Sequence, residues 1–312
     1  MSDDPQWPRA SAWLAGGREG TGRRLGVVGV PLSRTSISPS GAHETPTAVR
    51  AALHRFPTYH AGLDVDVEQL RVVDHGDLHV AVLSGEQALQ QVERGLRDLV
   101  QHDLLVLLGG DNAVTRPAMR ALMPDLARAG LLTLDAHHDV RGFHDGPTNG
   151  TPVRGLVEDG LPGTSIVQVG IGDLTNSRAY RRWCDDRGIT VVPASVARRD
   201  GVAAVVRREL DRLASDCDVL YVDLDVDVVD RAFAPGCPGA RPGGLLPAEL
   251  LGAAVEVGLH PAVRAVDVVE VDATADPGRI TVDLAAMCLL SVAAGLAARA
   301  KVVGPSDETL GT

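Results

Sequence analysis

Aromatic side chains are scarce in this sequence: Phe, Trp and Tyr together make up 3% of 312 residues, whereas hydrophobic residues as a whole make up 45%. The interior must therefore be built mainly from Val, Leu and Ala, as in parallel sheets whose strands are buried on both faces. This composition favours an α/β fold over a β-sandwich. The chain is longer than one average domain, but α/β folds of this size often form a single unit.

Cysteines and long apolar runs are also few. The four cysteines form no C-x-x-C pair, which argues against a zinc ribbon or a disulfide framework. The polar N-terminus has no apolar segment of the kind found in secretory signals. The longest uncharged run, 284–298, is shorter than the about 20 apolar residues that cross a bilayer. We therefore expect a cytoplasmic protein with reduced cysteines and no membrane partner.

A sustained basic stripe is missing as well. The formal net charge is -11, and binding to phosphate backbones requires clustered Lys and Arg. Nucleic acid is therefore excluded as the main partner, and a small polar or cationic ligand is easier to accommodate.

Apolar, β-branched runs alternate with helical patterns along the chain. Strands are expected at 25–30, 71–74, 104–108, 131–139, 166–169, 189–192, 219–227 and 263–269. Helices are expected at about 46–56, 84–101, 113–129, 176–187, 201–214 and 247–257, and from 281 or 283 onward. This order predicts an α/β/α sandwich of three layers around a mainly parallel sheet of roughly eight strands. We expect a loose N-terminal arm at 1–22, one domain at 23–302 and a C-terminal tail at 303–312.

The first chemical motif lies in residues 131–139, where an apolar run ends in Asp135, His137 and Asp139. Strand alternation would turn these three side chains to one side. Carboxylate and imidazole together suit Mn, Zn, Ni or Fe, and a carboxylate can bridge two ions. The alternative is that they are strand-end polar groups bound to backbone amides.

The second motif lies in residues 219–230, with Asp223, Asp225 and Asp227 at every second position. Packing three carboxylates together is costly unless cations neutralise them, so this run predicts a metal cluster. An exposed edge strand is the alternative, and the flanking Val and Leu residues argue against it. Ligands of parallel sheets bind beyond the carboxyl ends of the strands. The following polar residues are expected there, in one acidic active site: Asp111, Asn112, Asp135, His137, Asp139, Asp173, Asp225, Asp227 and Glu270.

Taken together, the motifs resemble those of the ureohydrolase superfamily, which includes arginase, agmatinase, guanidino-acid hydrolases and formimidoylglutamase. The likeness extends over about 25–300 and includes Gly29-Val30-Pro31, Gly109-Gly110-Asp111, Asp135-Ala136-His137-His138-Asp139, the block at 225–230 and Asp267-Val268-Val269-Glu270. It implies an arginase-like fold, two Mn(II) ions (or Ni or another divalent metal) and a homo-oligomer, either a trimer or a hexamer.

The resemblance also implies roles for individual residues. Asp135 and Asp225 would bridge the two ions, His137 and Asp227 would complete one site, and Asp139 would serve the other. A metal-bridging hydroxide would attack the amidine carbon. Asp139 would pass a proton to the leaving amine, and Glu270 would hold the amidinium or guanidinium group.

Two residues depart from the family pattern. Asn112 stands where the family usually has a histidine ligand, so one metal site is expected to be weak. Asn149 stands where arginase and agmatinase have a histidine, and we consider His144 as a replacement general acid; a solvated loop histidine is the alternative.

The second departure is shared with formimidoylglutamases, as is the arginine that follows Asp139. Arg141 and Arg154 would clamp a substrate carboxylate, with surface charge as the alternative. Asn149 and Asp173 are further candidate substrate-binding residues.

We therefore predict a metal-dependent hydrolase that cleaves the linear amidine C–N bond of formimidoyl-glutamate and releases formamide and glutamate. One alternative is a hydrolase of guanidino compounds that releases urea. A second is a metal-impaired homologue that serves as a binding or regulatory subunit.

Overall fold

The computed structural model describes residues 4–16 and 22–299, and its centre is a parallel sheet of eight strands. The strand order is β4-β1-β5-β10-β9-β6-β7-β8, and every neighbouring pair is parallel. The strands are β1 (Arg24–Val30), β4 (Arg71–Asp77), β5 (Leu104–Gly109), β6 (Ala129–Leu134), β7 (Ile166–Ile171), β8 (Thr190–Pro193), β9 (Val219–Asp225) and β10 (Val263–Val269). A short hairpin, β2 (Tyr59–His60) with β3 (Val65–Asp66), lies outside the sheet.

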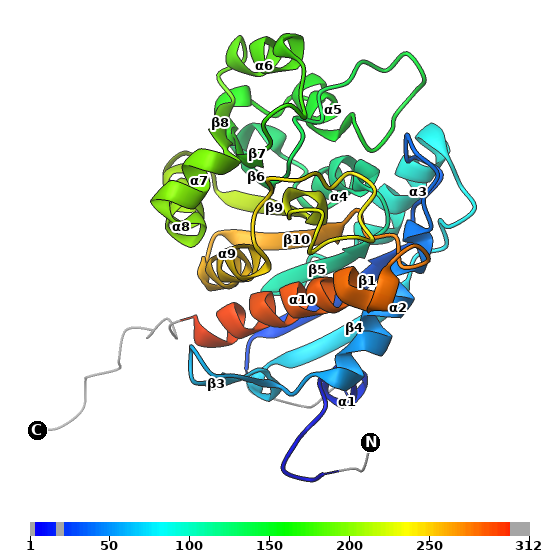
Figure 1. Ribbon diagram of the computed structural model, residues 1–312, viewed down its shortest axis with the longest axis vertical. Helices are drawn as coiled ribbons and strands as arrows, with labels where there is room; N and C mark the ends of the chain where they lie inside the picture. Colours follow the sequence, from blue (N-terminus) through cyan, green and yellow to red (C-terminus); the bar gives the residue numbers. More distant parts are fainter. Residues whose placement is uncertain (1–3, 17–21, 300–312) are drawn as a thin grey trace, which may run out of the picture.

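Helices cover both faces of this sheet (Figure 1). Alternate residues of a strand point to opposite faces, so Val27 belongs to the hydrophobic core that includes α2, α8, α9 and α10, whereas Val28 belongs to the core that includes α3 and α4. The helices are α1 (Ala10–Gly16), α2 (Thr45–Ala52), α3 (Gly85–Leu96), α4 (Thr115–Leu122), α5 (Pro152–Glu158), α6 (Arg178–Asp185), α7 (Ala194–Asp200), α8 (Val202–Asp216), α9 (Pro247–Leu259) and α10 (Ile280–Ala298). The predicted α/β/α sandwich with a parallel sheet is confirmed.

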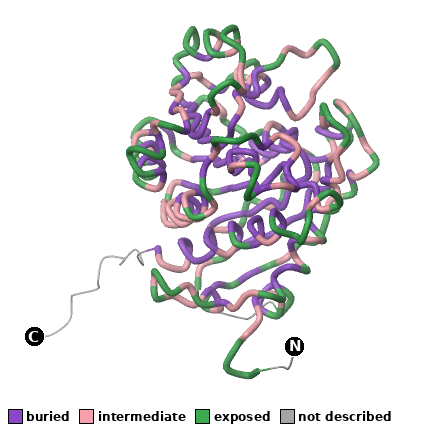
Figure 2. The backbone as a smooth tube through the Cα atoms, viewed as in Figure 1, coloured by how far each residue is buried: buried purple, intermediate pink, exposed green. Residues whose placement is uncertain are grey.

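Strands β5, β6 and β7 are buried at every position, as their high content of Val, Leu and Ile predicts (Figure 2). Several helices are shorter than predicted. For example, α4 ends at Leu122, two residues before Pro124, and the chain then turns into β6.

The predicted loose arm contains a packed helix. Trp13 and Leu14 of α1 are buried, and α1 contacts α2 and β4. The prediction is therefore wrong for Ala10–Gly16, because seven residues show too little periodicity to be recognised as an amphipathic helix. Residues 1–3 and 17–21 lie outside the described residues, as does the predicted tail at 303–312.

Helix α10 is apolar on all sides. The segment Pro277–Ala298 is long and apolar enough to cross a membrane, but 72% of its most apolar window is buried inside the protein. It packs against α9 and α2. A helix that is hydrophobic all round belongs in a protein core as readily as in a bilayer, and here tertiary packing covers it.

Two glycines allow α9 and α10 to approach each other closely. A Cβ atom on Gly258 would lie 2.2 Å from the carbonyl oxygen of Val292, and one on Gly295 would lie 2.3 Å from that of Val255. Both distances are shorter than any real Cβ contact, so a side chain at either position would push the helices apart.

We expect Gly258→Ala to destabilise the protein by about 1–3 kcal/mol, because the added methyl group overpacks the contact between α9 and α10. Gly252→Ala in the same helix is the matched control. A Cβ atom there would meet its nearest neighbour, the Cβ of Ala203, at an ordinary 3.7 Å, so we expect no loss of stability. Urea unfolding midpoints measure both effects. Equal midpoints for the two variants would contradict the close-packing argument.

Candidate metal centre

A small polar pocket is lined by residues at or after the carboxyl ends of β1, β6, β9 and β10. Its lining comes from six separate parts of the chain and consists of Ser36, Ile37, Ser38, His137, Asp139, Arg141, Asn149, Gly150, Asp225, Asp227, Pro238, Gly239, Arg241 and Glu270. This is the edge where the ligands of parallel sheets bind.

Short loops and turns, and not strand alternation, orient the acidic side chains. Strand β6 ends at Leu134, one residue before the first predicted ligand. Strand β9 ends at Asp225, whose carboxylate accepts a hydrogen bond of 2.8 Å from the backbone N–H of Asp227 and so caps a 3-10 turn. Asp139 has a φ of 53°, which lies in the left-handed region and turns the chain sharply. The prediction that the two strands continue to 139 and 227 is therefore wrong.

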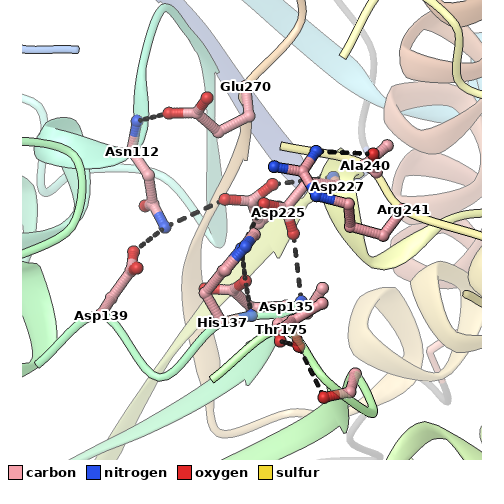
Figure 3. Close-up of polar contacts among 12 residues, drawn as sticks. Asn112, Asp135, His137, Asp139, Thr175, Asp225, Asp227, Ala240, Arg241 and Glu270 are labelled. Atoms are coloured by element: carbon pink, nitrogen blue, oxygen red, sulfur yellow. Dashed lines mark hydrogen bonds and ion pairs between the residues drawn. The ribbon is translucent and has the colours of Figure 1, made fainter. Parts of the chain in front are cut away.

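The acidic residues nevertheless converge, and they form two overlapping groups. The first ligand group is Asp135, His137 and Asp227, and the second ligand group is Asp135, Asp139 and Asp225. Within each group the potential ligand atoms all lie within 4.8 Å of one another. Asp135 belongs to both groups, which is the arrangement that a bridging carboxylate requires. Figure 3 shows these side chains pointing toward one another from the end of β9 and from the segments that follow β6 and β9.

In the first ligand group the imidazole is held by carboxylates. His137 Nδ1 lies 2.6 Å from Asp227 Oδ2 and 3.6 Å from Asp135 Oδ1. Burial alone would lower the pKa of His137, but the charges and hydrogen bonds of Asp227 and Asp135 raise it to about 12.

In the second ligand group the carboxylates repel one another. Burial, reinforced by the charge of neighbouring carboxylates, raises the pKa of Asp139 and Asp225 well above its ordinary value. Burial and the charge of Asp227 likewise raise the pKa of Asp135 to about 7.

Asp135 Oδ2 is buried and has no hydrogen-bond partner among the described residues. An unpartnered carboxylate oxygen inside an acidic cluster is the environment that divalent cations stabilise, so these donors fit a metal centre.

Asn112 lies beside the second ligand group, and its side-chain nitrogen, not its oxygen, faces that group. The Nδ2 atom donates to Asp139 Oδ2 at 2.9 Å and to Asp225 Oδ2 at 3.2 Å, whereas Oδ1 lies 2.6 Å from Thr115 Oγ1. The sequence led us to expect Asn112 as a metal ligand through its oxygen. The structure brings Asn112 to the centre, with the oxygen turned away.

Glu270 also lines the pocket, and its backbone is in the left-handed region, with a φ of 64°. Its Oε1 accepts hydrogen bonds from the backbone N–H of Asn112 at 2.8 Å and from Nδ2 of Asn149 at 2.9 Å. Burial and the charge of Asp111 raise the pKa of Glu270 to about 8, although the two hydrogen bonds oppose the rise. A positively charged group of a bound substrate would favour the ionised form of Glu270.

The predicted substrate-binding residues divide into two sets. Arg141 and Asn149 line the pocket. Arg154 does not: its Nε donates to the carbonyl oxygen of Val140 at 2.8 Å, and its guanidinium stacks on Trp183 at 4.6 Å. Asp173 is exposed and lies outside the lining. The positions of Arg154 and Asp173 therefore argue against the predicted binding of a substrate carboxylate by Arg154 and against substrate binding by Asp173.

The predicted replacement general acid, His144, is exposed and does not line the pocket. Its placement favours the solvated loop histidine.

Arg241 is a pocket residue that sequence reasoning missed. Its Nη1 donates to the carbonyl oxygens of Pro238 and Ala240, which holds the guanidinium beside the acidic cluster (Figure 3). The signal was its position in the Pro- and Gly-rich loop that directly follows the second acidic motif.

Comparison with known proteins identifies the family. Residues 23–295 match the sequence model of the arginase family.

The chain belongs to the arginase family.

Relatives within the arginase family include formimidoylglutamases. The enzyme of that name from Halalkalibacterium halodurans is 38% identical over 284 residues, which cover 88% of each chain. The crystal structure of Bacillus subtilis formimidoylglutamase has a TM-score of 0.88 and 31% identity, and the match covers 95% of this chain and 94% of that one. Trypanosoma cruzi formiminoglutamase, solved with Mn²⁺, shares the arginase-family fold with a TM-score of 0.84, at 23% identity over 94% of this chain and 100% of that one. The likeness to the ureohydrolase superfamily in the sequence is thereby confirmed.

Proposed function

We propose that this arginase-family protein is a formimidoylglutamase: a manganese-dependent hydrolase that converts formimidoyl-glutamate to formamide and glutamate. The observation that carries the proposal is the pocket itself, in which the two ligand groups and Glu270 face two arginines from different loops. The substrate has one cationic amidine and two carboxylates, so its charges match those of the pocket.

The metal centre would be held by the two ligand groups, with Asp135 shared between them. Two divalent ions bound there would lower the pKa of a water molecule and polarise the amidine. The relatives support manganese, and Ni or another divalent metal is an alternative. Because Asn112 replaces a histidine, we expect the ion of the second ligand group to be the more weakly bound.

The side chains of the pocket would divide the remaining work. Glu270 orients the amidinium by accepting its N–H groups, and Asn149 holds Glu270 in place. Asp139 takes a proton from the attacking water and passes it to the leaving amine, as a buried carboxylate that lines the pocket can do. His144 has no part in this sequence of steps.

Arg141 and Arg241 would bind the glutamate carboxylates. Gly150 makes room for Arg141, because a Cβ atom on Gly150 would lie 2.6 Å from Arg141 Cδ. A planar guanidinium binds a carboxylate through two parallel hydrogen bonds.

We expect Arg241→Met to raise KM for formimidoyl-glutamate about 10–100-fold with little change in metal content, because a charge-assisted hydrogen bond contributes about 1.5–3 kcal/mol. Steady-state kinetics and metal analysis measure the two quantities. Arg231→Met is the matched control: Arg231 lies in the same loop and also donates to its carbonyl groups, but it does not line the pocket. If both variants raised KM equally, the effect would come from the loop and not from carboxylate binding.

One assay tests the proposal directly. Manganese-loaded protein is incubated with formimidoyl-glutamate, agmatine and guanidino acids, while formamide, ammonia and urea are scored. Formamide from formimidoyl-glutamate, with at least 100-fold higher kcat/KM than any other compound, is the expected result. Urea release from a guanidino acid would favour the second candidate, because Glu270 and a single arginine would serve such a substrate equally well.

The third candidate function, that of a metal-impaired binding or regulatory subunit, is tested by metal analysis. Protein made in manganese-rich medium should retain close to two ions per chain. Near-zero metal would favour the binding protein, and the gathering of five of the six predicted ligands argues against it. We also expect a cytoplasmic homo-oligomer, either a trimer or a hexamer, which light scattering on the purified protein would identify.

Asn112→His is expected to tighten the ion of the second ligand group about tenfold, since imidazole is a better ligand than an amide oxygen for a transition metal. The measurement is the manganese retained per chain after dialysis at a series of free-metal concentrations. Unchanged retention would refute the placement of Asn112 at the metal centre.

A further inference from the structure

A second layer of polar residues lies behind Asn112, and the proposed mechanism does not use it. Thr115 begins α4, Asp267 lies in β10 and Tyr221 lies in β9, and all three are fully buried. Thr115 Oγ1 lies 2.6 Å from Asn112 Oδ1 and 2.8 Å from Asp267 Oδ2, and the hydroxyl of Tyr221 donates to the same Asp267 oxygen at 2.8 Å.

The hydroxyl of Thr115 has one hydrogen but two acceptors. Asn112 Oδ1 and Asp267 Oδ2 both lie within hydrogen-bond distance, so one of the two contacts lacks a hydrogen as the amide is oriented. Buried polar atoms in contact without a hydrogen between them are costly. The amide is thus poorly satisfied on the side that faces Thr115.

On its other side the same amide is satisfied by carboxylate oxygens. Its Nδ2 faces carboxylate oxygens of Asp139, Asp225 and Asp223 at 2.9, 3.2 and 3.4 Å. An ionised carboxylate can accept a hydrogen bond but cannot donate one. These contacts therefore favour the orientation in which the amide nitrogen points toward the carboxylates, as long as no cation lies among them.

A rotation of the Asn112 carboxamide by half a turn exchanges the positions of Oδ1 and Nδ2. Asn112 Nδ2 would then donate to Thr115 Oγ1, and Thr115 would donate to Asp267, so that each contact on this side contains one hydrogen. Asn112 Oδ1 would face the second ligand group, where an oxygen is unfavourable beside bare carboxylates but favourable beside a cation. The two orientations are therefore matched to the metal-free and metal-bound states.

We propose that Thr115 is a positioning residue that, backed by Asp267, holds the carboxamide of Asn112 with its oxygen toward the ion of the second ligand group. The amide turns over when that ion binds and returns when it leaves. This inference rests on the metal centre of the proposed function. It also explains how asparagine can serve in place of a histidine ligand: the neighbouring hydroxyl sets which end of the amide is presented.

Manganese binding to the full-length protein, measured by titration calorimetry, tests the inference without reference to turnover. We expect Thr115→Val to weaken one of the two ions about tenfold and to leave the other within twofold, as is usual when an outer hydrogen bond to a ligand is lost. Thr115→Ser, which keeps the hydroxyl, should restore wild-type affinity. Thr115→Ala takes the place of the valine variant if the latter does not fold.

A double-mutant cycle separates positioning from packing. In an Asn112→Ala background, Thr115→Val should have no further effect on manganese affinity, because Thr115 acts only through the amide. Thr58→Val is the matched control, since Thr58 is buried and its hydroxyl has no partner among the described residues; its affinities should equal those of the wild type.

An equal loss in both backgrounds, or unchanged affinity in Thr115→Val, would overturn the inference. Failure of the wild-type protein to bind manganese would instead contradict the proposed function.

Discussion

Asp225→Ala is expected to abolish turnover and the binding of at least one manganese ion. The Asp225 carboxylate belongs to the second ligand group and also caps the turn that orients Asp227, so its loss affects both groups. Bound ions contribute several kcal/mol to transition-state stabilisation, which corresponds to a loss in kcat of about a thousandfold or more. Metal analysis and steady-state kinetics measure the two effects.

The same variant should behave differently in the metal-free state. Burial and neighbouring carboxylates raise the pKa of Asp225, which means that its charge opposes folding when no cation is present. We therefore expect the metal-free variant to melt no lower than the metal-free wild type, while the rise in melting temperature caused by manganese disappears.

Asp218→Ala is the matched control, because Asp218 lies just before the same strand, is exposed and pairs with Arg128. If Asp225→Ala retained two ions, the ligand assignment would be refuted.

Glu270→Gln is expected to lower kcat/KM by about 30–1000-fold while manganese content stays unchanged. Glutamine has the same shape and can still accept from Asn112 and Asn149, but it no longer offers a negative charge to the amidinium group. Loss of one partner of a buried charge pair costs about 2–4 kcal/mol.

The pattern across the two measurements decides the role of Glu270. Loss of metal in Glu270→Gln would make it a ligand, and an unchanged kcat/KM would exclude it from substrate binding. Glu158→Gln serves as the control, since Glu158 is an exposed carboxylate at the end of α5.

The acidic cluster was predictable because buried carboxylates are costly without a partner. Three aspartates in an apolar run, and an Asp-x-His-x-Asp motif after another, can be buried only if something neutralises them. That argument needs no knowledge of where each strand ends. For this reason the convergence of Asp135 and Asp225 was predicted correctly even though the strand boundaries that supported it were not.

The placement of the arginines was harder to predict. Arg154 follows the same acidic motif as Arg141, 13 residues further along, yet it stacks on Trp183, while Arg241 lines the pocket from a loop 100 residues later in the sequence than Arg141. Long side chains on loops adopt whichever direction their distant neighbours allow, and no local pattern encodes those neighbours.

The sequence by itself determined the α/β class, the parallel sheet and the acidic edge, because hydrophobic periodicity and the cost of buried charge are properties of the residues in order along the chain. Only the tertiary structure decided that Asp227 lies in a turn, that Arg241 joins Arg141 and that Asn112 turns its nitrogen inward. These features depend on which hydrogen-bonding groups from distant segments meet in space, and in irregular loops that meeting is set by packing and not by spacing.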